Sequence, residues 1–124
     1  MNYINTKNAP AAIGPYSQAI DLGDFVFLSG QIPADAETGK LTEGSIEEKT
    51  SVVFKNIGAI LKEAGLEPKN VVKTTVFVKD LGNFGKVNGI YANFFGDHKP
   101  ARSFVEVSDL PKGVDIEIEL IAKR

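Results

Sequence analysis

The sequence has no cysteine and no tryptophan, and only one of its 124 residues is histidine. Without cysteine there can be no disulfide bond, no thiol catalysis and no thiolate metal ligand. A single histidine also supplies too few imidazole groups for most zinc sites. We therefore expect any catalysis to use carboxylates, hydroxyls, arginine, lysine, backbone groups and water, with no metal and no other cofactor.

Long hydrophobic runs and clusters of basic residues are missing as well. No apolar run is long enough to span a membrane, and the first ten residues, MNYINTKNAP, contain no apolar signal segment. The net charge is -2, and no group of neighbouring lysines and arginines offers a surface for phosphates. These features predict a cytoplasmic protein that binds neither membrane nor nucleic acid.

The composition that remains is typical of a globular protein, with 43% hydrophobic and 24% charged residues. A chain of this length can bury a core of its own but has little left over for a second one. No linker or low-complexity tract divides it. We therefore expect a single domain that spans residues 1–124.

Local patterns predict six strands and two helices. Ser45 and Glu48 have the spacing of a capping box, and Gly65 ends the apolar pattern of the first helix. Asn83 is the predicted N-cap of the second helix, which ends at Gly96. Alternating or β-branched runs, with a hairpin between the second and third, give the predicted strands 3–6, 16–20, 25–29, 71–78, 100–107 and 115–122.

Two helices are too few to cover both faces of six strands. The sequence therefore predicts a two-layer α+β domain, a six-stranded mixed sheet with both helices on one face. The uncovered face then needs a partner. We expect Phe104 and Ile121 to lie on or near it beside charged groups, and this mixture favours a symmetric homo-oligomer.

The last two strands alternate between apolar and polar side chains. This alternation predicts one sheet face that carries Glu117 and Glu119 together with Arg102 and Phe104. A charged strand face is usually solvated, which is the first interpretation. In the second, the face borders a polar cleft between subunits, where a guanidinium grips a carboxylate ligand while a nearby acid acts on the reacting atom.

Six stretches, in order along nearly the whole chain, resemble the Rid family, also called the YjgF family. They are NAPAAIGPYSQ (8–18), SGQIP (29–33), VVKTTVFVKDL (71–81), 87–91, PARSFVEV (100–107) and IEIELIA (116–122). The best-known members are 2-iminobutanoate/2-iminopropanoate deaminases. The resemblance implies a chorismate-mutase-like fold and a homotrimer with three ligand clefts between subunits.

The resemblance also implies a site, on Tyr16, Ser29, Gly30, Asn88, Arg102 and Glu117. In such proteins the arginine binds the substrate carboxylate, helped by backbone amides and the serine, and the glutamate holds the attacking water. Phe104 departs from the pattern, because many relatives have cysteine there. If this position acts through its backbone amide the change is tolerated, and if its side chain enters the cleft we expect a narrower pocket or altered substrate choice.

The residue chemistry fits hydrolysis of a 2-imino acid to a 2-keto acid and ammonia. The planar fork of Arg102 matches a carboxylate, and Glu117 can stabilise an iminium and orient water. Taken alone, Arg102 would more often be an ion-pair partner, Glu117 a solvated strand residue and Asn88 a helix-internal hydrogen-bonding group.

Two other functions stay open. The first is a non-catalytic trimeric sensor of small carboxylates such as 2-keto acids, which would use the same Arg102. The second is RNA cleavage with inhibition of translation, an activity attached to relatives under the name endoribonuclease L-PSP. The lack of a basic patch speaks against the second function.

Overall fold

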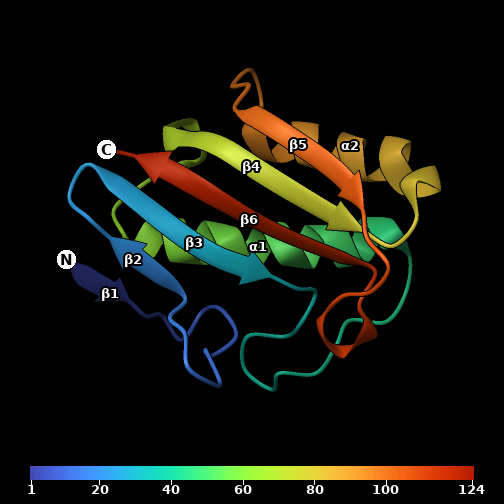
Figure 1. Cartoon of the computed structure of the whole chain (residues 1–124), viewed down its shortest axis with the longest axis horizontal. Helices are drawn as coiled ribbons and strands as arrows, with labels where there is room; N and C mark the ends of the chain where they lie inside the picture. The colour runs from blue at the N-terminus through green and yellow to red at the C-terminus, as the bar shows by residue number, and fades with distance from the viewer.

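The computed structural model describes all 124 residues and shows a six-stranded sheet with both α-helices on one side (Figure 1). The strand order is β1-β2-β3-β6-β4-β5, and only β4 and β5 pair in parallel. The predicted α+β class and mixed six-stranded sheet are confirmed. The elements are β1 (Asn2–Ile4), β2 (Ala19–Asp21), β3 (Phe25–Gln31), α1 (Ile46–Glu63), β4 (Val71–Val78), α2 (Phe84–Phe95), β5 (Ala101–Glu106) and β6 (Ile116–Lys123).

The start of α1 follows from its sequence as predicted. The hydroxyl of Ser45 accepts a hydrogen bond from the backbone N–H of Glu48 at 3.1 Å, and the Glu48 carboxylate accepts one from the Ser45 N–H at 3.4 Å. These reciprocal bonds satisfy two backbone donors that the first helical turn leaves unpaired. No helix of the structure combines the length and the apolar character that a membrane span requires.

Two predicted elements differ from the structure. The second strand was predicted over residues 16–20, but β2 spans only residues 19–21. The backbone turns sharply before them, with the N–H of Tyr16 bonded to the Gly14 carbonyl at 2.9 Å. Asn83 makes no side-chain cap on α2. Asp80 instead accepts from the Gly82 N–H at 2.8 Å and caps a short 3-10 turn that leads into the helix.

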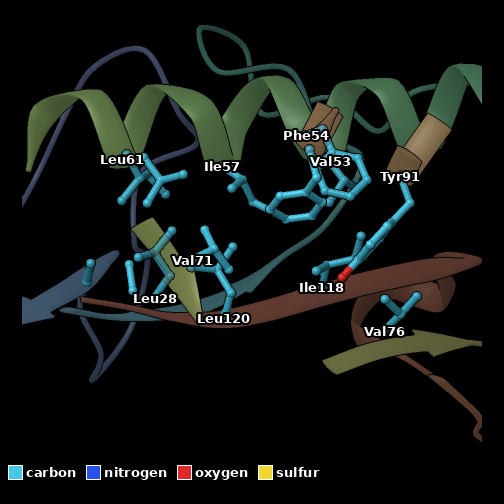
Figure 2. Packing of buried hydrophobic residues seen from close by; sticks show 14 of the residues in the cluster. Leu28, Val53, Phe54, Ile57, Leu61, Val71, Val76, Tyr91, Ile118 and Leu120 are labelled. Atoms are coloured by element: carbon cyan, nitrogen blue, oxygen red, sulfur yellow. The ribbon is translucent and has the colours of Figure 1, made fainter. Parts of the chain in front are cut away.

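The core lies between the helices and the sheet (Figure 2). Val53, Ile57 and Leu61 point from α1 toward the strands, where they meet Ile118 and Leu120 of β6. All of these side chains are at most 3% exposed. The alternate residues of β6 that were predicted to be apolar therefore form the buried face of its strand, as expected.

The other face of the sheet has no helix over it. Phe25 and Phe27 of β3 are 40% and 43% exposed there, and Val105 of β5 is 39% exposed. Ile121 and Glu119 of β6 belong to the same face, since they alternate with the buried residues. Apolar and charged groups are thus mixed on a surface that nothing in this chain covers.

The last residue is tied back onto the hairpin of β2 and β3. The N–H of Arg124 donates to the Asp24 carbonyl at 2.9 Å, and its guanidinium pairs with Asp21. The hydrogen bond from Arg124 holds the pKa of the Asp21 carboxyl below its ordinary value. This contact closes the sheet at the end where β6 and β3 pair.

Because Ile57 is fully buried, we expect Ile57→Ala to lower the free energy of unfolding by about 2–5 kcal/mol. Urea unfolding followed by circular dichroism measures the change. The same substitution at Ile13, which is 83% exposed, is the matched control and should change stability little. Equal effects at the two positions would contradict the described core.

Candidate active site

The candidate site is a cleft of about 570 Å³ beside the end of β3 and the start of β6. Three connecting segments form its walls, and Figure 1 shows the loops after β3 and before β6 converging at this edge. Three of the predicted site residues line it, namely Tyr16, Gly30 and Glu117. Its other lining residues are Pro10, Ala11, Ile13, Gln18, Gln31, Ile32, Ala34, Ala36, Glu37, Thr38, Gly39, Pro111 and Lys112.

Two buried amides hold the irregular walls of this cleft. Gln18 is 2% exposed; its Oε1 accepts from the Thr6 N–H at 2.7 Å, and its Nε2 donates to the carbonyls of Thr6 at 3.1 Å and Pro10 at 2.9 Å. Asn56 of α1 is 1% exposed and donates to the Ala34 carbonyl at 2.9 Å. These bonds satisfy backbone groups that have no strand or helix partner, so the loops keep one shape.

Ser29 supports the cleft without lining it. Its hydroxyl donates to the Ser17 carbonyl at 2.6 Å, and its N–H donates to the Gln18 carbonyl at 3.0 Å. Both bonds fix the segment that carries Tyr16. In this structure the predicted ligand-binding serine therefore positions the backbone segment that contains Ser17 and Gln18.

The Glu117 side chain crosses directly over Gly30, in space that a larger residue would fill. A Cβ built on Gly30 would lie 2.7 Å from Cδ of Glu117, and closer still to Oε2. The register of β3 against β6 shifts between Leu28 and Gln31, which brings this stretch of backbone next to the carboxylate. The close approach turns the Glu117 carboxyl into the cleft.

Burial raises the pKa of the Glu117 carboxyl above its usual range, and the negative charge of Glu119 raises it further. A carboxyl with a raised pKa can hold or release a proton nearer to neutral pH than an exposed one. The same cleft receives Lys112, which has the left-handed backbone angle φ 58°. No three acidic or histidine side chains come together in a group that could hold a metal ion.

Arg102 and Phe104 lie on the helix side of the sheet, so the prediction that they share the face of Glu117 is wrong. In the parallel ladder Arg102 pairs with Thr74 and Phe104 with Val76, and both partners are fully buried under the helices. Paired residues of neighbouring strands point to the same side. Alternation along β5 separates two sets of side chains but does not say which set faces the helices.

Arg102 belongs to a second cluster of predicted site residues. Its Nη1 donates to Oδ1 of Asn88 in α2 at 2.8 Å. The centroid of the Phe104 ring lies 5.4 Å from its Cζ atom. The structure thus joins Arg102, Asn88 and Phe104 to one another, and the Asn88 side chain holds the guanidinium.

The two groups of site residues do not meet within one chain. Arg102 pairs with Thr74, which pairs with Leu120, three residues along β6 from Glu117. Standard strand geometry then separates Arg102 and Glu117 by about 10 Å across the strands and about 10 Å along them, on opposite faces. Glu37 and Lys112, which sequence reasoning missed, come from irregular loops that carry no periodic pattern.

Comparison with known proteins shows the family. The family model described as endoribonuclease L-PSP matches residues 6–124. A RutC family protein of Pyrococcus abyssi is 56% identical over 119 residues, which cover 96% of this chain and 94% of that one. The 2-iminobutanoate/2-iminopropanoate deaminase of Salmonella typhimurium is 53% identical over 124 residues, covering 98% and 96%. The chain belongs to the Rid family.

Solved structures of Rid-family proteins and their relatives have the same fold. The crystal structure of a candidate endoribonuclease of Thermotoga maritima is 53% identical, with a TM-score of 0.99 over 100% of this chain and 98% of that one. The crystal structure of Escherichia coli TdcF with bound serine is 43% identical, with a TM-score of 0.95 over 100% and 99%. The resemblance found in the sequence is confirmed.

The raised pKa of Glu117 makes stability depend on pH. A carboxyl whose pKa is raised by folding contributes stability below its unfolded value, near 4.5, and that stability is lost as pH rises through the folded pKa. We expect Glu117→Gln to be more stable than wild type near pH 7, and the difference to vanish near pH 4. Urea unfolding at both pH values measures it, with exposed Glu43→Gln as control. An increase in the free energy of unfolding that is equal at both pH values would contradict the burial of this charge.

Gly30→Ala tests the close approach directly. The added methyl group should push the flexible end of Glu117 out of its buried position, so the pKa of Glu117 should fall toward its usual value with little loss of fold. A carboxyl carbon NMR titration measures this pKa. Gly89→Ala is the control, because nothing lies within 4 Å of a Cβ there. An unchanged Glu117 titration in Gly30→Ala would contradict the contact.

Proposed function

We propose that this Rid-family protein hydrolyses reactive 2-imino acids, such as 2-iminobutanoate and 2-iminopropanoate, to 2-keto acids and ammonia. The observation that carries the proposal is the half-buried Glu117 carboxyl, held over Gly30 inside a cleft and with a raised pKa. The name of the Salmonella relative supports the reaction. The serine in TdcF supports the ligand class, since serine also joins a carboxylate to a carbon that bears nitrogen.

Each step of the reaction can be assigned to a side chain of this protein. Arg102 binds the substrate carboxylate through its parallel N–H groups, and Glu117 orients a water molecule toward the C=N carbon. The water oxygen bonds to that carbon, the π electrons move to nitrogen, and Glu117 accepts the water proton. Glu117 then returns the proton to nitrogen, which leaves a carbinolamine. Glu117 next carries the hydroxyl proton of this intermediate to nitrogen, the oxygen electrons form the C=O bond as the C–N bond breaks, and the products are a 2-keto acid and ammonia.

Tyr16 and Phe104 complete the proposed subsites. Tyr16 is 55% exposed at the edge of the cleft, where its ring can cover a bound substrate and its hydroxyl can donate. The backbone amide of Gly30 lies beside Glu117 and can help to hold the substrate carboxylate. Phe104 borders Arg102 and limits the space for the substrate next to the guanidinium.

The proposal requires a second copy of the chain, because Arg102 and Glu117 lie on opposite faces of one sheet. We infer a homotrimer in which the Arg102 cluster of one copy closes the Glu117 cleft of the next. The uncovered sheet face, with Phe27, Val105 and Ile121, supplies an apolar surface for such contacts. The number of copies follows from the family resemblance.

Cleavage of RNA is the second candidate, since the matching family model is described as an endoribonuclease. The cleft does not favour it. Glu37 and Glu117 give its lining two carboxylates against the single ammonium of Lys112, and this balance repels a phosphate backbone. A sensor of 2-keto acids would use the same groups without turnover.

An imine-hydrolysis assay tests the proposal. A dehydratase or an amino-acid oxidase generates the imino acid in situ, and semicarbazide traps what is not hydrolysed. We expect wild type to accelerate keto-acid release and Arg102→Ala to lose about a hundredfold of this activity while keeping its fold. Exposed Lys99→Ala is the control. If wild type releases keto acid from several imino acids no faster than buffer does, while it still binds keto acids, the protein is a sensor.

Mixing two inactive variants tests the shared cleft. Arg102→Ala and Glu117→Gln chains, unfolded together and refolded, should recover about a quarter of the wild-type activity by random pairing. Each variant refolded alone should stay inactive. Failure to recover activity in mixed assemblies would show that both residues act within one chain or not at all.

A further inference from the structure

The guanidinium of Arg102 is surrounded by three aromatic rings. Its Cζ atom lies 4.7 Å from the ring centroid of Tyr91, 5.4 Å from that of Phe104 and 5.5 Å from that of Phe84. Asn88 holds one of its nitrogens at 2.8 Å. The rings replace part of the hydration shell of the cation, and their electron-rich faces attract it.

Tyr91 is the fixed member of this aromatic cage. Its side chain is 8% exposed and points from α2 toward the sheet (Figure 2). Its hydroxyl shares a hydrogen bond of 2.7 Å with Thr74 of β4, the residue that pairs with Arg102. Phe95 packs against its ring at a centroid distance of 4.8 Å. The ring under the guanidinium is therefore held by the sheet below it and by the core beside it.

Phe84 and Phe104 form the outer part of the cage. Their ring centroids are 4.8 Å apart, so they also pack against each other. Phe84 is 42% exposed, and Phe104 is half-buried. With Tyr91 and the Asn88 amide they surround the guanidinium and restrict its rotation.

We propose that Tyr91 is a positioning residue of the carboxylate subsite, which fixes the plane of the Arg102 guanidinium, and that Phe84 and Phe104 complete the cage. This proposal rests on the proposed function only in assigning the carboxylate to Arg102. A guanidinium fixed in one plane presents two parallel N–H groups to a planar carboxylate, so less entropy is lost on binding. Phe104 supplies the third ring.

The experiment measures binding of pyruvate, a 2-keto acid probe, and rotation of the Arg102 guanidinium by nitrogen-15 NMR. Tyr91→Leu removes the ring and should weaken pyruvate binding about tenfold. Tyr91→Phe keeps the ring and should stay within about twofold of wild type. Phe94→Leu is the matched control, since Phe94 stacks on Phe54 in the same aromatic cluster, at 4.6 Å, and is not one of the three rings around Arg102.

Guanidinium rotation separates positioning from a general loss of packing. We expect slow rotation about the Nε–Cζ bond in wild type, Tyr91→Phe and Phe94→Leu, and faster rotation in Tyr91→Leu. Phe84→Leu, at an exposed position where folding is not at risk, should also speed rotation and weaken binding about threefold.

Unchanged rotation in both Tyr91→Leu and Phe84→Leu would overturn the proposal, as would wild-type affinity for pyruvate in both. Rotation is measured without ligand, so the result does not depend on turnover. Wild type could bind pyruvate, with the variants changing this affinity as expected, and yet hydrolyse no imine. In that case the proposed function is wrong, and the role of the aromatic cage in positioning Arg102 is still supported.

Discussion

The pairing of β6 on both of its sides is the constraint on which the rest of the molecule depends. This strand joins β3 and β4, so it places the N-terminal hairpin and the C-terminal half in one sheet. Its alternation buries Ile116, Ile118 and Leu120 under the helices. The same period of two sends Glu117 to the other side, where the shifted register of β3 brings Gly30 beneath it. The register of β6 against its two neighbouring strands therefore determines both which residues form the core and which line the cleft.

The edge strand β5 explains why the polar residues divide into two groups. Its only neighbour is β4, and their parallel ladder turns Arg102 toward α2 rather than toward the cleft. At the sheet edge the helices leave room for a charged group, provided that aromatic rings and Asn88 replace the water it loses. A cation and a carboxyl are thereby presented on opposite sides of the same domain. Such an arrangement suits an assembly in which each copy contributes one side of a shared cleft.

Local signals allowed much of this fold to be predicted from the sequence. The capping box at Ser45, the boundaries of β4 and the buried residues of β6 were all correct, because each depends on neighbours in the chain. The side on which Arg102 lies could not be predicted, since it depends on pairing with Thr74 in another strand. Lys112 was missed for a similar reason: its loop is placed by contacts across the fold, with no pattern of its own.

The ladder between β3 and β6 also sets an order of events during synthesis. Phe25 pairs with Lys123, so the first long strand must wait for nearly the last residue of the chain. The hairpin of β2 and β3 is therefore made long before β6, and the centre of the sheet stays open until β6 is available. Pairing between such distant segments slows folding and leaves strand edges uncovered for longer. The ion pair of Arg124 with Asp21 then joins the end of β6 to the hairpin of β2 and β3.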